Sequence, residues 1–496
     1  LNSAGGAETY LAKYTPAGTL VWAVTSGGTT DDGAISLDLD ASGNIYLTGT
    51  FEGTINFGGG PLTASGFDIF VVKYNNAGQH IWSKSFGGTD DEQGNSIKVN
   101  AAGTYVAISG SFEGTMNMGT GAITSHGSSN AFVALLDAGG TALWLNGFGG
   151  NNFALDRSTT VTMDNALNIY AAGTISGSNI DMDPGAGTHI ISSAGSSDIF
   201  LSKFNTAGVF QDALIIGAAK GEREGGVVIN ANGDIYITGY SNSDSIDVDP
   251  GAGIHYLYGQ TGILFVQDVI VLKYDAAFNY QWGFRIGKRA SDSGFDIALD
   301  ANGNLFITGG MGDSLVDFDP GPGIHYLTGD SNVLNSVPFL AQYNESGNFI
   351  DAFSLTGVGG SSALALTGNN KIYITGYFQS SSIDLDPGAG NQTATNAGLF
   401  DAFVSEYNYT STINIYTDNK KELHIFPNPV SDYLYFEPAL DNNSEITISD
   451  ISGKTVMNYS AKNAKSISLK NLKSGMYFLD INNENENWKQ RLIKID

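Results

Sequence analysis

The sequence predicts an all-β protein, in which a β-propeller of four-stranded antiparallel blades is followed by a small C-terminal β-sandwich. Three observations carry this prediction: a repeat of more than sixty residues, short alternating apolar runs within each repeat, and a change of composition near residue 417. The chain has 496 residues, with 65 glycines, 11 prolines and 15% charged residues. This is a turn-rich β composition, and its periodic apolar runs exclude a disordered chain.

The repeat is clearest in a segment that reads NIYLTG at residues 44–49. The chain contains six versions of this segment, counting the first. Successive copies of its last glycine are 61 to 70 residues apart, at Gly49, Gly110, Gly173, Gly239, Gly309 and Gly376. A unit of this length that contains only short apolar runs fits one small antiparallel sheet.

Four strands are expected in each unit. In the first complete unit they cover residues 34–40, 44–51, 68–75 and 80–88, and Asn- and Gly-rich turns separate the tight hairpins. Four antiparallel strands repeated without helices are typical of a propeller. A solenoid is the main alternative, but parallel β-helix repeats are much shorter.

Six complete units start near residues 34, 95, 158, 225, 294 and 360. Before them, residues 7–14 and 19–28 match only the third and fourth strands of a unit. We therefore expect six complete blades and a partial blade. We also expect a seven-bladed ring in a longer protein, in which residues upstream of Leu1 supply the two missing strands.

A tryptophan recurs at the start of the fourth strand as Trp22, Trp82, Trp144 and Trp282, and two units carry Asp212 or Asp351 instead. Buried aromatic residues dominate the cores between sheets. We expect these tryptophans to pack between neighbouring blades rather than to form an exposed ligand platform.

The charge is distributed unevenly along the chain. Residues 1–416 hold 13 Lys and Arg against 39 Asp and Glu, whereas residues 417–496 hold 10 against 11. Such an acidic domain repels phosphate backbones, so we expect no nucleic-acid partner and favour cations or neutral ligands such as glycans. The absence of cysteine excludes disulfides, thiolate catalysis and Cys-ligated zinc. No apolar run approaches the ~20 residues of a transmembrane helix.

The repeat pattern Asp-x-Phe-x-x-Lys-Tyr, Gly-x-x-x-Trp and Gly-Asn-Ile-Tyr-x-Thr-Gly resembles the bacterial β-propeller repeat called SBBP. This resemblance implies the propeller fold and no single activity. Two units depart from it, with Leu135-Leu136 and Gln342-Tyr343 where others read Lys-Tyr or Lys-Phe.

After residue 422 short strand-like runs alternate with Asn, Asp and Gly turns, which predicts a small β-sandwich. Pro427 and Pro429 favour an extended segment at its start. We divide the chain into a propeller (1–416), a linker (417–424) and a C-terminal domain (425–496).

This tail resembles the type A C-terminal sorting domain of the Bacteroidetes type IX secretion system. The matching segments are Pro427-Asn428-Pro429, Asp450-Ile451-Ser452-Gly453, Leu472 through Gly475 to Tyr477, and Lys494. The resemblance implies export by the type IX machinery, followed by secretion or attachment at the outer cell surface, often with removal of the tail. The alternative is an ordinary accessory sandwich.

A repeated acidic motif, Asp-x-Asp-Pro-Gly, marks the excursion between the second and third strands of units three to six. Its carboxylates lie two residues apart and share one face of an extended segment, which leaves two readings open: a weak calcium site or a turn cap. Calcium is the one cofactor considered. The pairs are Asp181 and Asp183, Asp247 and Asp249, Asp317 and Asp319, and Asp384 and Asp386. The histidines that follow, His189, His255 and His325, recur once per blade and are expected to be structural.

No nucleotide-binding loop, zinc-protease motif or nucleophile elbow is present, and the loop acids Asp31, Asp32, Asp90 and Asp91 are expected to be solvated turns. The even repetition favours a non-enzymatic binding or scaffold module, exported by its tail, with a glycan, matrix or protein ligand on one rim. The alternative is a secreted polysaccharide hydrolase with carboxylates of several blades at the central channel. A spacer role is a third possibility.

Overall fold

The protein is described by a computed structural model. It describes residues 5–150, 156–251, 253–259, 266–312, 315–329, 335–388, 390–409, 424–426, 430–437, 440, 444–450, 454–461, 464–482 and 487–495. These residues form strands and turns, with no helix among them. The chain divides into two compact units, Leu1–Ser411 and Thr412–Asp496, each of which is considered by itself.

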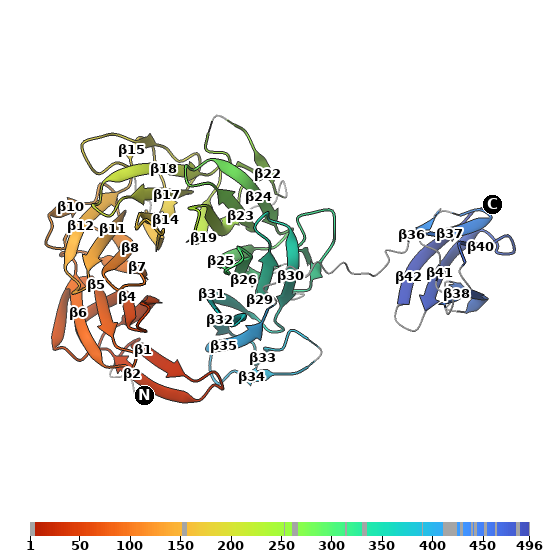
Figure 1. The fold of residues 1–496 in the computed structure, drawn as a ribbon, viewed down its shortest axis with the longest axis horizontal. Helices are drawn as coiled ribbons and strands as arrows, with labels where there is room; N and C mark the ends of the chain where they lie inside the picture. Colours follow the sequence, from red (N-terminus) through yellow and green to blue (C-terminus); the bar gives the residue numbers. More distant parts are fainter. Residues whose placement is uncertain are drawn as a thin grey trace. The chain divides into compact units, whose positions relative to one another are not determined.

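The first unit is a ring of antiparallel sheets, as expected for a propeller (Figure 1). Five sheets have four described strands each. Blade 1 has β3 (Asp32–Leu39), β4 (Ile45–Asn56), β5 (Pro61–Tyr74) and β6 (His80–Phe86). Blade 2 has β7 (Glu92–Val99), β8 (Tyr105–Phe112), β11 (Asn130–Asp137) and β12 (Ala142–Phe148). Blade 3 has β13 (Arg157–Met163), β14 (Ile169–Ile175), β17 (Asp198–Phe204) and β18 (Phe210–Ile216).

The remaining blades continue the same order around the ring. Blade 4 has β19 (Glu222–Ile229), β20 (Ile235–Ser241), β23 (Asp268–Tyr274) and β24 (Tyr280–Ile286). Blade 5 has β25 (Asp292–Leu299), β26 (Leu305–Met311), β29 (Val337–Tyr343) and β30 (Phe349–Ser354). Blade 6 has β31 (Gly359–Thr367), β32 (Lys371–Phe378) and β35 (Asp401–Asn408), and its expected fourth strand lies outside the described residues.

The excursion between the second and third strands carries a small hairpin in blades 2 to 6. These hairpins are β9 (Thr115–Asn117) with β10 (Ala122–Thr124), β15 (Ile180–Asp181) with β16 (Ile190–Ile191), β21 (Ser245–Asp247) with β22 (Tyr256–Tyr258), β27 (Val316–Asp317) with β28 (Tyr326–Leu327), and β33 (Ser382–Asp384) with β34 (Thr393–Thr395). In blade 1 the excursion instead extends β4 and β5 themselves. The hairpins lie at the outside of the ring (Figure 1).

The expected partial blade is also present. It consists of β1 (Thr9–Tyr14) and β2 (Leu20–Ser26), which pair with each other as a two-stranded sheet. The neighbouring β3 leaves Ile35, Leu37 and Leu39 about half exposed, whereas the matching residues Ile97 and Val99 of β7 are buried against blade 1.

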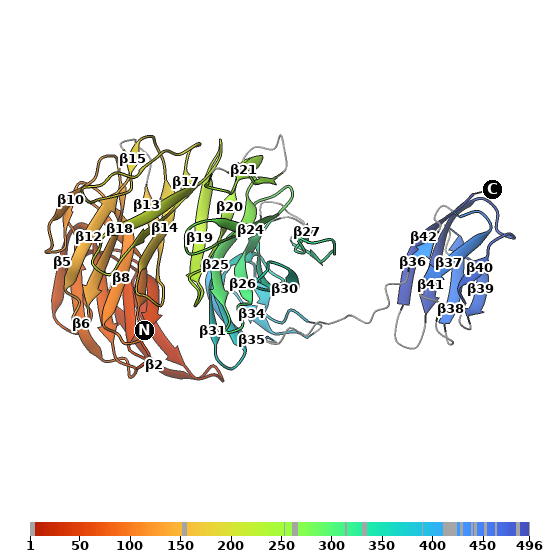
Figure 2. The ribbon, with the colours of Figure 1, turned by 45° about the horizontal axis from the view of Figure 1, so that its top comes forward.

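Apolar side chains between neighbouring blades form the core of the ring. The first strand of each complete blade lies nearest the centre, and the sheets stand around the ring axis (Figures 1 and 2). One cluster joins Tyr46 and Val71 of blade 1 to Ile97, Ile108 and Phe132 of blade 2. Because blades 2 to 5 have a neighbour on each face, their second strands are almost wholly buried.

The four recurrent tryptophans each link their own blade to the next, which confirms the packing expected from the sequence. Each indole N–H donates to a carbonyl in the turn between the third and fourth strands of the following blade. The bonds are Trp22 to Asn76 (3.3 Å), Trp82 to Ala138 (3.0 Å), Trp144 to Thr206 (3.1 Å) and Trp282 to Glu345 (3.2 Å).

Each of these turns presents a glycine to the indole ring. Gly140 has φ +78°, which favours glycine, and a Cβ built on it would lie 2.8 Å from the Trp82 ring. Both the backbone conformation and the close indole ring therefore favour glycine at this position. The turn of blade 4 follows a blade that carries Asp212 in place of Trp, and there the positive-φ residue is Phe278. The glycine therefore recurs where an indole needs the space.

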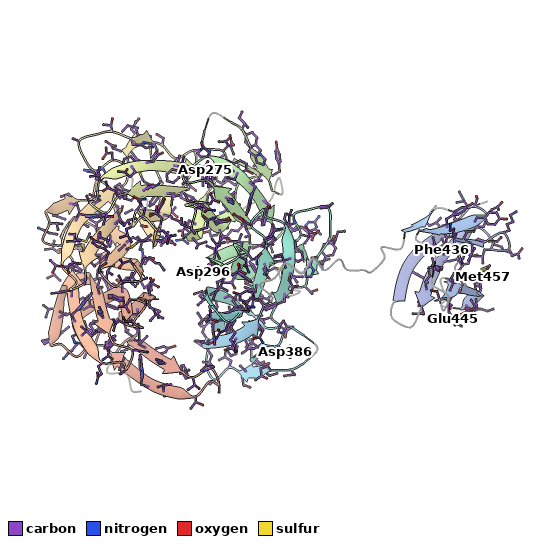
Figure 3. All side chains as sticks on the ribbon, viewed as in Figure 1. Asp275, Asp296, Asp386, Phe436, Glu445 and Met457 are labelled. Atoms are coloured by element: carbon purple, nitrogen blue, oxygen red, sulfur yellow. The ribbon has the colours of Figure 1, made fainter. Side chains whose placement is uncertain are left out.

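The second unit is a β-sandwich, as predicted. One sheet has β36 (His424–Phe426), β37 (Tyr433–Glu437) and β40 (Ser466–Ser468), and the other has β38 (Ser444–Asp450), β39 (Thr455–Ala461), β41 (Gly475–Asn482) and β42 (Asn487–Lys494). Leu434, Phe436, Ile448 and Leu479 belong to one apolar cluster between the sheets. Figure 3 labels Phe436 on this unit.

We predict that Gly140→Ala destabilises the propeller more than Gly18→Ala. Both glycines have nearly the same positive φ, +78° and +75°, but nothing lies within 4 Å of a Cβ on Gly18. Left-handed strain costs about 1–2 kcal/mol at either site, and overpacking against Trp82 adds about 1–3 kcal/mol at Gly140 alone. Urea unfolding of the two variants measures the difference, and equal losses would contradict the proposed contact.

Candidate ligand-binding pocket at the propeller face

A polar pocket opens where the inner strands of blades 3 and 4 begin. Its volume is about 270 Å³. Hydroxyl and amide side chains supply much of the wall, and Tyr240 adds an aromatic ring. The lining residues are Arg157, Thr174, Ser176, Ser196, Ser197, Gly221, Glu222, Arg223, Tyr240 and Asn242.

Two arginines distinguish this pocket from the rest of the ring. The chain has only five arginines, and Arg157 of β13 and Arg223 of β19 line the same pocket. Both occupy the register position that holds Gly33, Gln93, Ser293 and Gly360 in the other blades. Among the described residues, neither guanidinium has a hydrogen-bond or ion-pair partner. Burial raises the pKa of Glu224 and the positive charge of Arg223 opposes this rise, and Glu222 lines the same pocket, but neither acid forms an ion pair with an arginine there. Two neighbouring cations outside any described ion pair favour an anionic ligand.

Behind the pocket, Glu224 is buried in the wall between blades 3 and 4. It is 3% exposed, and its carboxylate accepts hydrogen bonds from the hydroxyls of Thr159 and Thr160 on β13. Burial raises the pKa of Glu224, and these hydrogen bonds oppose the rise. The carboxylate thus joins two inner strands and does not face the open pocket.

Asp296 of β25 has a similar role between blades 5 and 6, close to the centre of the ring (Figure 3). Its Oδ1 accepts the N–H of Ile297 at 2.8 Å, and its Oδ2 accepts the N–H of Leu364 in blade 6 at 2.8 Å. Burial, with a smaller effect of the negative Glu224, raises the pKa of Asp296 to about 6. Ser36 and Ser96 make the corresponding bonds to Ile97 and Val161. The inner strands are thus joined by side-chain to backbone bonds.

A second set of buried acids lies at the junctions between neighbouring blades. At the junction of blades 3 and 4, Asp198 Oδ2 accepts the N–H of Ala194 at 2.6 Å. Glu222 accepts the N–H of Ala218 and the hydroxyl of Ser241, both at 2.9 Å. Burial and, to a smaller extent, the negative charge of Glu222 raise the pKa of Asp198 to about 7.

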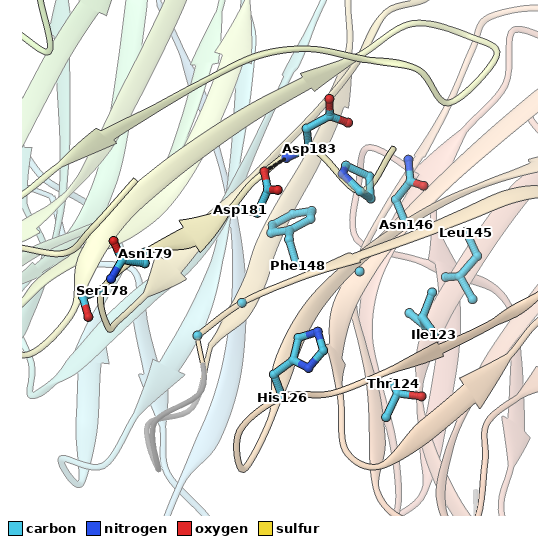
Figure 4. A pocket seen from close by; sticks show the side chains of 14 residues that line it. Ile123, Thr124, His126, Leu145, Asn146, Phe148, Ser178, Asn179, Asp181 and Asp183 are labelled. Carbon is cyan, nitrogen blue, oxygen red and sulfur yellow. Dashed lines mark hydrogen bonds between the residues drawn. The ribbon is translucent and has the colours of Figure 1, made fainter. Parts of the chain in front are cut away.

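The Asp-x-Asp-Pro-Gly motifs lie in the outer hairpins, one pair per blade, and the structure does not bring pairs together. Asp181 and Asp183 border a groove of about 810 Å³ between the hairpins of blades 2 and 3, which also contains His126, Asn146 and Phe148 (Figure 4). The groove is lined by β10, β12, β15 and the loops beside them.

Within each motif the carboxylates cap the turn. Asp181 Oδ1 accepts the N–H groups of Asp183 (3.1 Å) and His189 (2.8 Å), and Asp183 Oδ1 accepts that of Gly185 (2.8 Å). The other three motifs repeat these bonds, with Asp247 and Asp249, Asp317 and Asp319, and Asp384 and Asp386. In the described part of the chain, no three His, Cys, Asp or Glu side chains are grouped to hold a metal ion. Calcium at these loops stays a prediction.

The motif histidines pack on the first aromatic residue of the fourth strand. His255 lies 4.6 Å from the Tyr280 ring and His325 lies 4.7 Å from the Phe349 ring, between centroids. His189 lies 5.3 Å from Phe210. They are therefore spread around the ring, one per blade. Of the loop acids, Asp31 and Asp91 accept the N–H groups of Ala7 (2.8 Å) and Phe67 (3.1 Å). Asp32 is 1% exposed at the start of β3 and accepts the N–H of Gly28 at 2.7 Å, so the solvated turn expected for it is wrong.

Part of the expected sorting signal lies within the described sandwich. Gly475 pairs with Lys494 in the β41–β42 ladder, and Tyr477 Oη donates to the carbonyl of Lys473 at 2.9 Å. Lys494 is buried, and its Nζ donates to the carbonyl of Ile495 at 2.5 Å. Pro427, Asn428, Pro429 and Gly453 lie outside the described residues.

The tail matches a known family. Residues 424–495 match the model described as the secretion system C-terminal sorting domain. The sorting domain therefore indicates export by type IX secretion, to the cell surface or outside the cell. The described residues contain no helix with the length and apolar character needed to cross a membrane.

Two curated proteins are distantly similar to the chain. An uncharacterized WD repeat-containing protein of Acanthamoeba polyphaga mimivirus is 24% identical over 237 residues, which are 41% of this chain and 16% of the relative. The regulatory protein FlaEY of Caulobacter vibrioides is 26% identical over 248 residues, 45% of this chain and 25% of the relative. The chain thus spans a quarter or less of each relative.

Solved structures resemble the chain only weakly. The polysaccharide lyase Uly1 has 10% identity and a TM-score of 0.34, and the match covers 93% of this chain and 90% of that one. Sqt1 from Chaetomium thermophilum has 9% identity and a TM-score of 0.33, with 71% and 95% covered. A Bacteroides caccae protein of unknown function has 9% identity and a TM-score of 0.30, with 70% and 94% covered. Similarities this low carry no statement about activity.

We predict that Asp198→Asn flattens the pH dependence of stability. The folded protein holds the Asp198 proton up to a pKa of about 7, whereas the unfolded chain releases it near its ordinary value of 3.8. The free energy of unfolding therefore falls as pH rises from about 4 to 7. Asn130 already fills this position in blade 2. We expect the variant to be more stable by about 2–4 kcal/mol at pH 8 and unchanged at pH 4, measured by urea unfolding in EDTA. Parallel pH profiles would contradict the assignment.

Proposed function

We propose that this exported propeller is a non-enzymatic binding module that takes an acidic carbohydrate in the face pocket of blades 3 and 4. One observation carries the proposal: Arg157 and Arg223 line the same small pocket, and neither forms an ion pair or a side-chain hydrogen bond with a described residue. The wider domain is strongly acidic, so this pair is a local exception to its charge.

The pocket chemistry fits a sugar carboxylate. A guanidinium presents parallel N–H groups to a carboxylate, and such charge-assisted bonds fix the orientation of the ligand as well as its charge. Ser196, Ser197 and Asn242 can pair with sugar hydroxyls, and Tyr240 offers a ring with a polar tip. A uronic acid residue of a polysaccharide has the matching combination of one carboxylate and several hydroxyls.

The size of the pocket and the charge of the domain favour a carbohydrate over larger partners. At about 270 Å³ the pocket is near the lower limit of small-molecule sites. Nucleic acid would bring a row of phosphates against a domain with 39 acidic and 13 basic residues. Export outside the cell places the domain where polysaccharides occur.

Binding is better supported than hydrolysis. A glycosidase needs two carboxyl groups placed ~5–10 Å apart on either side of a sugar linkage. Two acids of the inner strands, Glu224 and Asp296, are held by hydroxyls and backbone N–H groups. Their bonds support a structural role.

We further infer that the repeats are of the SBBP type, that the tail is the type A form found in Bacteroidetes, and that the propeller ends near residue 416. The repeat pattern and the tail motifs support these assignments. A linker over 417–424 and a sorting domain over 425–496 complete this division of the chain.

If the proposal is correct, the affinity for an acidic oligosaccharide depends on both Arg157 and Arg223. Calorimetric titration of the purified chain with oligogalacturonate should show binding that neutral galacto-oligosaccharides do not show. We expect Arg157→Ala and Arg223→Ala each to weaken binding about 10-fold to 100-fold, the range for a lost hydrogen bond to a charged group.

The matched control is Arg289→Ala, which removes one exposed positive charge of the blade 4–5 loop outside the pocket. It should leave the affinity unchanged. If all three variants bind oligogalacturonate equally, the arginine pocket is not the binding site. If no variant and no wild-type protein binds acidic oligosaccharides, the proposed ligand class is wrong.

A further inference from the structure

Two carboxylates are buried together where blades 1 and 2 meet. Asp68 lies on β5 and Glu92 is the first residue of β7. Asp68 is 8% exposed and Glu92 is fully buried. Acidic side chains are rarely buried this deeply unless a positive group or hydrogen-bond donors compensate them.

Each carboxylate uses one oxygen locally and leaves the other without a donor. Glu92 Oε2 accepts the N–H of Gly88 at 2.9 Å, and Asp68 accepts a backbone N–H from Ser65. Asp68 Oδ1 and Glu92 Oε1 are both buried, and no donor among the described residues reaches either atom. A buried acceptor in this state costs about 1–3 kcal/mol, and more when it is charged.

Two glycines form the wall that faces these oxygens. A Cβ built on Gly87 would lie 2.3 Å from Asp68 Oδ1 and 2.7 Å from Glu92 Oε2. A Cβ built on Gly88 would lie 2.2 Å from the carbonyl oxygen of Thr115 and 3.2 Å from Glu92 Oε1. The two glycines thus let the backbone approach both carboxylates and the Thr115 carbonyl closely, because any side chain there would collide with them.

The charges acting on Glu92 are all negative. Burial has the largest effect and, with smaller contributions from the negative Asp68, Asp90 and Asp91, raises the pKa of Glu92 to about 7 against the lowering effect of the Gly88 N–H. Once ionised, the two buried carboxylates repel each other, and none of the described groups that act on Glu92 is positive.

The junction of blades 4 and 5 shows how the same fold supplies that charge elsewhere. There Arg285 Nε donates to Asp268 Oδ2 at 2.6 Å, and its other nitrogens donate to the carbonyls of Ser243 (2.7 Å) and Ser241 (3.1 Å). Asp268 occupies the register position of Asp68, and Ser85 stands where Arg285 would be in blade 1. At the junction of blades 4 and 5 the Arg285 guanidinium thus contacts an aspartate and two carbonyls. At the junction of blades 1 and 2 a serine, Ser85, takes the place of this arginine.

We propose that Asp68 and Glu92, with the carbonyl of Thr115, bind a calcium ion that links blades 1 and 2. The site is separate from the Asp-x-Asp-Pro-Gly hairpins and from the arginine pocket. Calcium suits the ligand set because it takes carboxylate and carbonyl oxygens in flexible geometry and completes its shell with water. Zinc would require nitrogen or sulfur ligands at most positions.

The test compares calcium binding by the full chain and by Asp68→Asn/Glu92→Gln. After EDTA treatment and desalting, calorimetric titration with calcium should give one more bound equivalent for the wild type than for the double variant. Calcium should also raise the melting temperature of the wild type by more. In EDTA the double variant should be as stable as the wild type or more stable, because it lacks the buried like charges.

Two further variants sharpen the test. Asp90→Asn removes an exposed acid of the same loop and should keep the full number of calcium equivalents. Ser85→Arg copies the arrangement of Arg285. It should abolish binding of the one calcium ion at this site and raise the free energy of unfolding in EDTA. This variant serves as the test if the double variant does not fold. The proposal is overturned if the wild type, the double variant and Ser85→Arg bind the same number of calcium ions and show the same calcium-dependent shift in melting temperature. In that case Asp68 and Glu92 share a proton and bind no calcium ion.

Discussion

The ring depends on the contact that each blade makes with the turn of the next. A four-stranded sheet cannot bury both faces alone, so its stability comes from its neighbours. The tryptophan at the start of the fourth strand makes this contact specific, because its indole N–H donates to a turn carbonyl and its ring needs a glycine beneath it. Nearer the centre, Ser36, Ser96 and Asp296 bond to backbone N–H groups of the next inner strand. The packing of successive blades therefore rests on side chains at fixed repeat positions.

Much of this fold is predictable from the sequence because the same physical demands recur with each unit. Alternating apolar runs specify strands, and Asn-Gly turns specify tight hairpins. The tryptophan spacing indicates the contact between blades. Where Asp212 replaces the tryptophan, the turn of the next blade carries Phe278 in place of glycine. The hairpins within the excursions were not separated from their loops by pattern alone, because two- and three-residue strands carry too little periodicity.

The candidate pocket could be predicted only in part. Arg157 and Arg223 are 66 residues apart in sequence, and only alignment of the inner strands places them at one register position in adjacent blades. The same alignment would have shown that most other blades carry small residues there. The Asp-x-Asp-Pro-Gly motifs are conspicuous because they repeat, but their bonds serve local turns. The sequence does not indicate that Asp68, Glu92 and Glu224 are buried, because burial between blades depends on the assembled ring.

The crystal structure of the chain with a bound oligogalacturonate tests the central claim most directly, since it locates the ligand rather than only its affinity. The account predicts a sugar carboxylate against the guanidinium groups of Arg157 and Arg223, with hydroxyls near Asn242 and the ring of the sugar beside Tyr240. A ligand seated instead in the groove between the outer hairpins of blades 2 and 3, with the arginine pocket empty, would contradict it.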